Sequence, residues 1–111
     1  MTESKIKYED FAKLDLRIAT VLEVKPHPNA DKLYILTIDL NTETRTIVAG
    51  IKNYYKEEEL IGKQIVIVSN LEPAKLRGIE SNGMLLAASD EKGNLVVLTP
   101  DKNIENNSKV K

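Results

Sequence analysis

The sequence contains no cysteine and only one histidine, and both facts limit the catalytic and metal-binding sites that it can form. Without cysteine there can be no disulfide, no thiolate nucleophile and no zinc site built on sulfur. The single histidine, His27, lies between Pro26 and Pro28, and no second histidine or cysteine completes a metal site or a nucleophile–base pair. We therefore interpret His27 as a turn residue whose ring packs on the rim of the fold.

Other groupings typical of enzymes are missing as well. The acidic residues Asp31, Asp39 and Asp90 share no spacing typical of a catalytic carboxylate pair, and the glutamates at 57–59 indicate a solvated helix face. The five glycines are dispersed, so there is no glycine-rich phosphate loop. The sequence predicts a protein that is not an enzyme and that uses no metal and no cofactor.

Neither an excess of one charge nor a long apolar run is present. The formal net charge is -1, so binding to a polyanion requires a local cluster of Lys and Arg. No stretch reaches the length of a membrane span, and the N-terminus lacks the apolar core of a signal peptide. We expect a cytoplasmic protein that does not enter a membrane, with residues 1–7 as a flexible N-terminus and residues 8–111 as one domain.

What is present is a series of short extended segments. In the first of them Leu16, Ile18, Leu22 and Val24 share one face by strict alternation. The fourth contains Ile-Val-Ile-Val, which favours a strand covered on both faces. The five predicted strands are 16–24, 33–40, 45–49, 64–69 and 84–88, and a further apolar segment follows at 95–98.

Two short helices are predicted beside these strands. A helical turn at 10–13 places Phe11 and Leu14 on the core, and a helix within 52–62 begins at Asn53 as its N-cap. Three strands, a helix and further strands match an all-β OB-fold, a five-stranded Greek-key barrel, here with a C-terminal extension. An SH3-like barrel is the nearest alternative.

The segment 70–89 carries the clearest candidate site. Lys75 and Arg77 alternate across Leu76, so in an extended loop both side chains project the same way toward adjacent phosphates. Ser81 adds a neutral hydrogen-bonding group suited to ribose or base edges. Met84 either lines the site or fills the core. The alternative is that the cations only keep a loop tip soluble.

Residues outside this loop extend the candidate surface. Lys52 and Asn53 begin the predicted helix, where an anion can meet positive side chains and free backbone donors. Lys32 and Arg45 flank the second and third strands. Tyr34, Tyr54 and Tyr55 can stack on bases, but core or rim packing is the favoured interpretation.

Three segments also carry a family resemblance. They are residues 27–34 (His-Pro-Asn-Ala-Asp-Lys-Leu-Tyr), residues 45–51 (Arg-Thr-Ile-Val-Ala-Gly-Ile) and residues 70–89 (Asn-Leu-Glu-Pro-Ala-Lys-Leu-Arg-Gly-Ile-Glu-Ser-Asn-Gly-Met-Leu-Leu-Ala-Ala-Ser). Together they resemble the tRNA-binding domain found at the C-terminus of many methionyl-tRNA synthetases and in free-standing tRNA-binding proteins. The likeness runs from about Tyr8 to the C-terminus.

The resemblance implies an OB-fold that binds tRNA mainly by shape and without catalysis. It implies a homodimer assembled partly through the C-terminal region, and association with the catalytic part of methionyl-tRNA synthetase. It also implies peptide-binding relatives that resemble secretion chaperones, which gives an alternative function. The RNA contacts that it implies are Lys32, Arg45, Lys52, Asn53, Lys75, Arg77, Ser81 and Met84.

Overall fold

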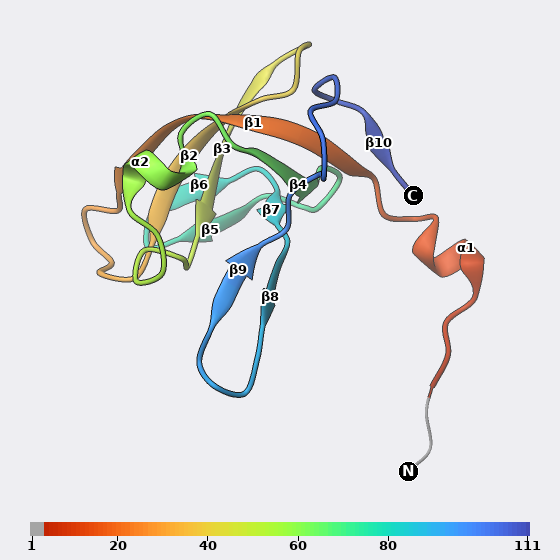
Figure 1. Ribbon diagram of the computed structural model, residues 1–111, viewed down its shortest axis with the longest axis horizontal. Coiled ribbons are helices and arrows are strands. Elements are labelled where there is room, and N and C mark those ends of the chain that lie inside the picture. The colour runs from red at the N-terminus through yellow and green to blue at the C-terminus, as the bar shows by residue number, and fades with distance from the viewer. Residues whose placement is uncertain (1–3) are drawn as a thin grey trace.

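An antiparallel sheet that curls on itself forms the body of the molecule (Figure 1). In this computed structural model, which describes residues 4–111, the strands of the main sheet follow the order β3-β2-β1-β4-β7. Their bounds are β1 Leu16–Pro26, β2 Tyr34–Asp39, β3 Thr44–Ala49, β4 Gln64–Val68 and β7 Met84–Leu85. The long β1 is shared, because its first half pairs with β4 and its second half with β2.

The curled sheet is closed between β3 and the chain just before β7. The amide of Asn82 donates to the carbonyl oxygen of Thr46 at 2.9 Å, and the amide of Val48 donates to the hydroxyl of Ser81 at 2.9 Å. These bonds turn the sheet into a barrel with an apolar interior. The fully buried side chains inside it include Leu36, Ile38, Leu40, Ile47, Leu60, Ile65 and Ile67.

The face predicted for β1 does not form one continuous core face: Ala19 and Val21 join the core cluster, whereas Leu16 and Ile18 are buried outside it. A β-bulge between Val21 and Glu23 places an extra residue in β1, and Leu22 is 47% exposed instead of buried. A bulge inverts the alternation beyond it, so the core receives Val21 and Val24 from the two sides of the irregularity. It also adds the local twist that lets one strand serve both halves of the barrel.

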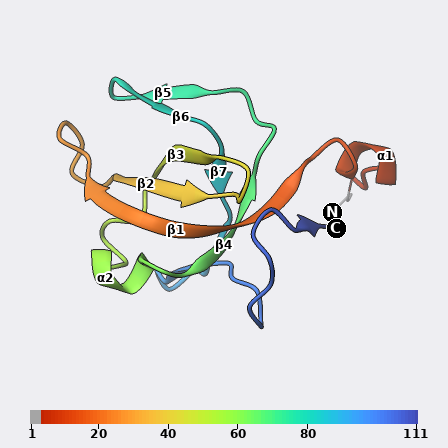
Figure 2. The ribbon, with the colours of Figure 1, turned by 90° about the horizontal axis from the view of Figure 1, so that it is seen from above.

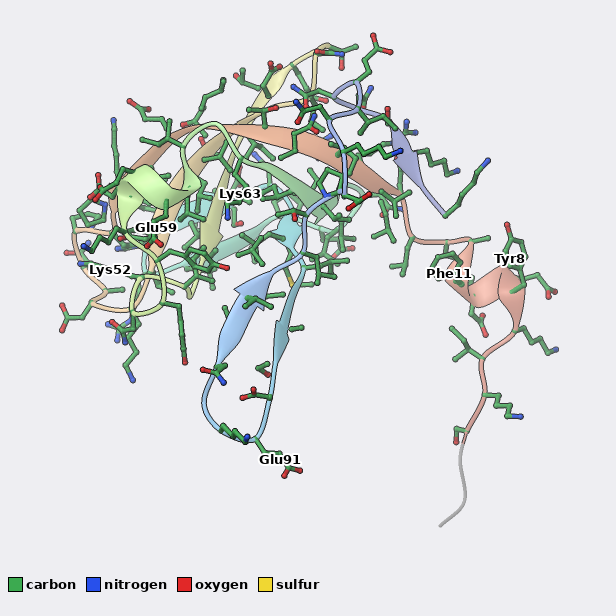
Figure 3. All side chains as sticks on the ribbon, in the orientation of Figure 1. Tyr8, Phe11, Lys52, Glu59, Lys63 and Glu91 are labelled. Carbon is green, nitrogen blue, oxygen red and sulfur yellow. The ribbon has the colours of Figure 1, made fainter. Side chains whose placement is uncertain are left out.

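Both predicted helices exist, but their boundaries and contacts differ from expectation. Helix α1, Tyr8–Phe11, lies beyond the N-terminal end of β1 and away from the barrel (Figures 1 and 3). Phe11 and Leu14 therefore do not reach the core. Helix α2, Glu57–Leu60, starts at Lys56, whose amide donates to the Glu59 carboxylate at 2.6 Å. Asn53 lies in the preceding turn and is not the N-cap.

Two ribbons and the C-terminal segment complete the chain. Strands β5, Ala74–Leu76, and β6, Ile79–Ser81, form one hairpin; β8, Ala87–Ser89, and β9, Leu95–Val97, form a second that projects from the barrel (Figure 1). The C-terminal segment runs along the edge of β1 that β4 leaves free, where Ile18 exchanges backbone hydrogen bonds with Asn107 and Ser108. Strand β10, Lys109–Val110, then pairs with the start of β1.

The expected flexible N-terminus spans residues 1–7, and residues 1–3 of it lie outside the described residues. Residues 4–7 are exposed and have no regular structure.

Candidate functional site

The predicted loop with Lys75 and Arg77 is a tight β-hairpin. Arg77 and Gly78 occupy the two central turn positions with φ of 54° and 90°, the positive pair that characterises a type I′ turn. Lys75 lies on β5 directly opposite Glu80. The expectation that both cations project the same way from an extended loop is therefore wrong, because Arg77 stands on the turn and Lys75 stands on the strand.

An apolar groove of about 440 Å³ runs between this hairpin, β3 and β7. Ala74 and Leu76 face into it from β5, which sends the intervening Lys75 to the opposite face of the hairpin. Met84 is 46% exposed and lines the groove, so of the two predicted places it takes the groove and not the core. The lining contains no aromatic side chain, and Glu72 is its only charged residue.

Three segments meet at one end of the barrel, beside this groove. The hairpin tip lies next to the β1–β2 loop in Figure 2, and the Nε2 atom of His27 in that loop is 2.9 Å from the Leu76 carbonyl oxygen. The same loop reaches the chain after β3, where the Lys52 amide donates to the Lys32 carbonyl oxygen at 3.3 Å. Residues 27–33, 52–54 and 75–78 thus form one continuous rim.

Four cations lie on this rim: Lys32, Lys52, Lys75 and Arg77, which we call the basic rim. Within residues 4–111 none of them is part of an ion pair shorter than 4.0 Å, whereas Lys13, Arg17, Lys25 and Arg45 each have a carboxylate partner. Lys52 is labelled on its loop in Figure 3. Unpaired cations gathered from three loops form the local cluster that the near-neutral net charge requires for anion binding.

Ser81, a predicted RNA contact, lines the groove but uses its hydroxyl within the protein. Its side chain is 4% exposed, accepts a hydrogen bond from the Val48 amide and donates one to the Gly83 carbonyl oxygen at 2.9 Å. The bond from Val48 holds β3 against the segment before β7, and the bond to Gly83 fixes the path of that segment. Its position in a polar loop gave no signal of this burial, because the partners lie far away in sequence.

Arg45 is likewise committed to the protein. Its guanidinium makes a two-point contact with the Glu43 carboxylate at 3.2 Å and donates to the Ser69 carbonyl oxygen at 2.6 Å. The bond to Ser69 ties β3 to the end of β4 across the barrel seam. Because Glu43 neutralises its charge, we do not count Arg45 among the cations that face an outside anion.

The three tyrosines near the rim have different surroundings. Tyr34 is buried and donates to the Tyr55 carbonyl oxygen at 2.8 Å; burial, with Glu57, Glu58 and Glu59 nearby, raises the pKa of its phenol. The Tyr55 hydroxyl accepts from the Val97 amide, and Lys63 sits 5.3 Å from its ring centre. The expected core and rim packing is confirmed for these two, whereas Tyr54 is 48% exposed beside Lys52 and Asn53.

Residues 4–111 contain no group of three or more His, Asp or Glu side chains placed to hold a metal ion. None of the helices described is long and apolar enough to cross a membrane.

Comparison with known proteins decides the family. The model of the putative tRNA-binding domain matches residues 16–109, which is most of the chain. The chain belongs to this tRNA-binding domain family. Methionine–tRNA ligase of Pyrococcus horikoshii is 60% identical over 106 residues, covering 96% of this chain but only 14% of the ligase. The chain therefore spans about a seventh of the length of the ligases that it matches.

Two solved structures carry the same architecture. A MetRS-related protein from Pyrococcus horikoshii superimposes with a TM-score of 0.93 at 31% identity, covering 98% of this chain and all of its own. The chaperone CsaA from Bacillus anthracis gives a TM-score of 0.89 at 34% identity, covering 97% of this chain and all of its own. The predicted all-β, OB-like barrel and the predicted membership of the tRNA-binding family are confirmed.

Proposed function

We propose that this chain is a non-catalytic tRNA-binding module that acts in the cytoplasm as the C-terminal domain or a separate subunit of methionyl-tRNA synthetase, or as a free-standing tRNA-binding protein. One observation carries the proposal. In a chain of a tRNA-binding family, four cations that make no ion pair shorter than 4.0 Å within residues 4–111 gather on one rim of the barrel, beside an open groove.

The rim would act by neutralising phosphates. Lys32, Lys52, Lys75 and Arg77 come from three loops, so together they suit the backbone of a folded RNA more than one linear strand. Asn53 is exposed between them and offers an amide to a ribose or base edge. Met84 would contact the RNA from the groove side. Ser81 and Arg45 are left out of this surface because both are engaged within the barrel.

A salt titration of tRNA binding tests the proposal. If four phosphates are neutralised, the logarithm of the association constant should fall with the logarithm of salt concentration at a slope of about -3 to -4. Arg77→Asn removes one cation and keeps a residue that tolerates positive φ, so it should lower affinity and make the slope shallower by roughly 0.7 to 0.9 without unfolding the turn.

Lys92→Ala is the matched control, because Lys92 is an exposed cation in the turn between β8 and β9, whose tip at Glu91 lies well away from Lys52 (Figure 3). It should leave the slope unchanged. A slope near zero for the unmodified chain would rule out the phosphate mechanism. Equal losses in Arg77→Asn and Lys92→Ala would place the RNA elsewhere.

Peptide binding is the second candidate, and the apolar groove is the observation that favours it. The groove is lined by aliphatic residues such as Leu71, Leu76 and Met84, which suits aliphatic side chains of an extended peptide better than stacked bases. A similar fold belongs to a protein named as a chaperone. Binding of an unfolded peptide that survives high salt and is lost in Met84→Asp would support this function over RNA binding.

We also propose that the chain forms a homodimer and that it associates with the catalytic part of methionyl-tRNA synthetase. Support for a partner comes from α1 and the turn after it, where Tyr8 in the helix is 76% exposed, Leu14 in the turn is 42% exposed, and neither belongs to the core cluster of the barrel. Two copies would double the number of rims presented to one RNA, and the gain in effective concentration would offset the acidic residues Glu72 and Glu80 near the hairpin.

A further inference from the structure

The side chain of His27 makes a long-range hydrogen bond to the β5–β6 hairpin. The position of His27 in the sequence gave no indication of this contact. The residue is 4% exposed, and its ring reaches the backbone of Leu76, which is 49 positions away in sequence. Among the described residues, and apart from the pairing of β5 with β6, this is the only hydrogen bond that joins residues 71–80 to the rest of the chain. The hairpin is otherwise tethered at its base, through Ser81 and Asn82.

The two ring nitrogens of His27 have separate partners, and these select the tautomer of the neutral ring. The Asn29 amide donates to Nδ1 at 3.0 Å, so Nδ1 carries no proton. A neutral imidazole must then carry its proton on Nε2, which lies 2.9 Å from the Leu76 carbonyl oxygen and donates to it. The ring is therefore held from its own loop and reaches outward to the hairpin.

The peptide bond that accepts this hydrogen bond joins Leu76 to Arg77. Fixing it orients the turn on which Arg77 stands, because Arg77 and Gly78 follow immediately with their restricted positive φ values. The backbone of His27 also pairs with Leu33, directly beside Lys32, through a hydrogen bond of 3.0 Å. One side chain thus links the loop of Lys32 to the turn of Arg77.

We infer that His27 is a positioning residue that holds the β5–β6 hairpin in place, so that Arg77 acts on the same ligand as Lys32 and Lys52. It touches no ligand itself. The part of this inference that concerns RNA rests on the proposed function, whereas the effect on the hairpin does not. Without His27 the hairpin would remain folded on its base but its tip would lose a fixed direction.

Two substitutions separate the hydrogen bonds of the ring. In His27→Asn the Oδ1 atom replaces Nδ1 as the acceptor for the Asn29 amide, but the side chain is too short to reach Leu76. In His27→Gln the longer side chain carries an amide donor to the place of Nε2. Asparagine therefore removes the bond to the hairpin, and glutamine is expected to restore it.

Hydrogen exchange of the amides in residues 75–81 of the free protein is the first measurement. Exchange should be about 2- to 10-fold faster in His27→Asn, the loss expected from one hydrogen bond, and close to the unmodified rate in His27→Gln. Nitrogen-15 spectra of the imidazole should show the proton on Nε2. Equal exchange in the unmodified chain and His27→Asn, or no recovery in His27→Gln, would overturn the inference.

The second measurement places Arg77→Asn and Lys52→Ala in both the unmodified and the His27→Asn backgrounds and follows tRNA affinity. Because the position of Arg77 depends on the direction of the hairpin, Arg77→Asn should lower tRNA affinity several-fold in the unmodified chain but less than 2-fold in the His27→Asn background. Lys52→Ala should cost the same in both. An unchanged Arg77 penalty would show that His27 does not position the cation. If the unmodified chain fails to bind tRNA, the proposed function fails, and the exchange experiment still decides the role of His27.

Discussion

Ser81→Ala should destabilise the fold because its hydroxyl closes the barrel. The substitution leaves the buried Val48 amide without its acceptor and removes the donor to Gly83. An unsatisfied buried amide costs about 1–3 kcal/mol, and with the second bond the loss should be about 2–3 kcal/mol. For a chain of 111 residues this corresponds to a fall in Tm of roughly 8–15 °C.

Thermal unfolding followed by circular dichroism measures this effect, and Ser89→Ala is the matched control. Ser89 is an exposed residue of β8 with no side-chain hydrogen bond in the described part of the chain, so its substitution should change Tm by less than about 2 °C. The reasoning predicts a large difference between two chemically identical substitutions. Equal Tm values for the two variants would refute the assigned role of the Ser81 hydroxyl.

Two further substitutions test the seam and the acid stability. Gly83→Ala should lower the free energy of unfolding in urea by about 1–3 kcal/mol, because φ is 131° and a Cβ would lie 3.2 Å from the Val68 carbonyl oxygen. Gly50→Ala is the control and should be nearly neutral, since its Cβ would make only an ordinary contact at 3.6 Å. Equal losses in the two variants would contradict this account. The hydrogen bond from Arg17 lowers the pKa of Asp15 below 3.8, so its stabilisation is present at neutral pH and lost as pH falls below that value. At pH 7, Asp15→Asn should therefore lower the free energy of unfolding, but by under about 1 kcal/mol because the Asp15 side chain is 35% exposed. The difference from the unmodified chain should vanish near pH 2. A difference that stays constant with pH would exclude a contribution from the ionisation of Asp15.

The local pattern of the sequence was sufficient for most of the strands. Alternation in 33–40 predicts the buried face of β2, where Tyr34, Leu36 and Ile38 point inward, and the β-branched run in 64–69 predicts β4. These assignments succeed because side-chain alternation depends only on neighbouring residues. The prolines that flank His27 likewise mark where β1 ends.

Predictions that depend on pairing succeeded less often. The bulge at Leu22 lies where β1 changes its pairing from β4 to β2 in the closed barrel. No residue type near Leu22 indicates the extra residue. Helix α1 carries an apolar Phe11, but the path of the chain after it carries that side chain away from the core. Apolar character alone does not specify what a residue packs against.

The candidate site divides in the same way. The sequence by itself offered no recognisable catalytic motif, placed cations near 75–77 and at Lys32 and Lys52, and showed motifs that resemble a tRNA-binding family. Only the tertiary structure decided which polar residues remain free. Ser81 and Arg45 are bound across the seam, and His27 is bound to Leu76, by contacts 24 to 49 positions apart. Such contacts arise when the sheet closes, so their donors and acceptors cannot be paired from neighbouring residues.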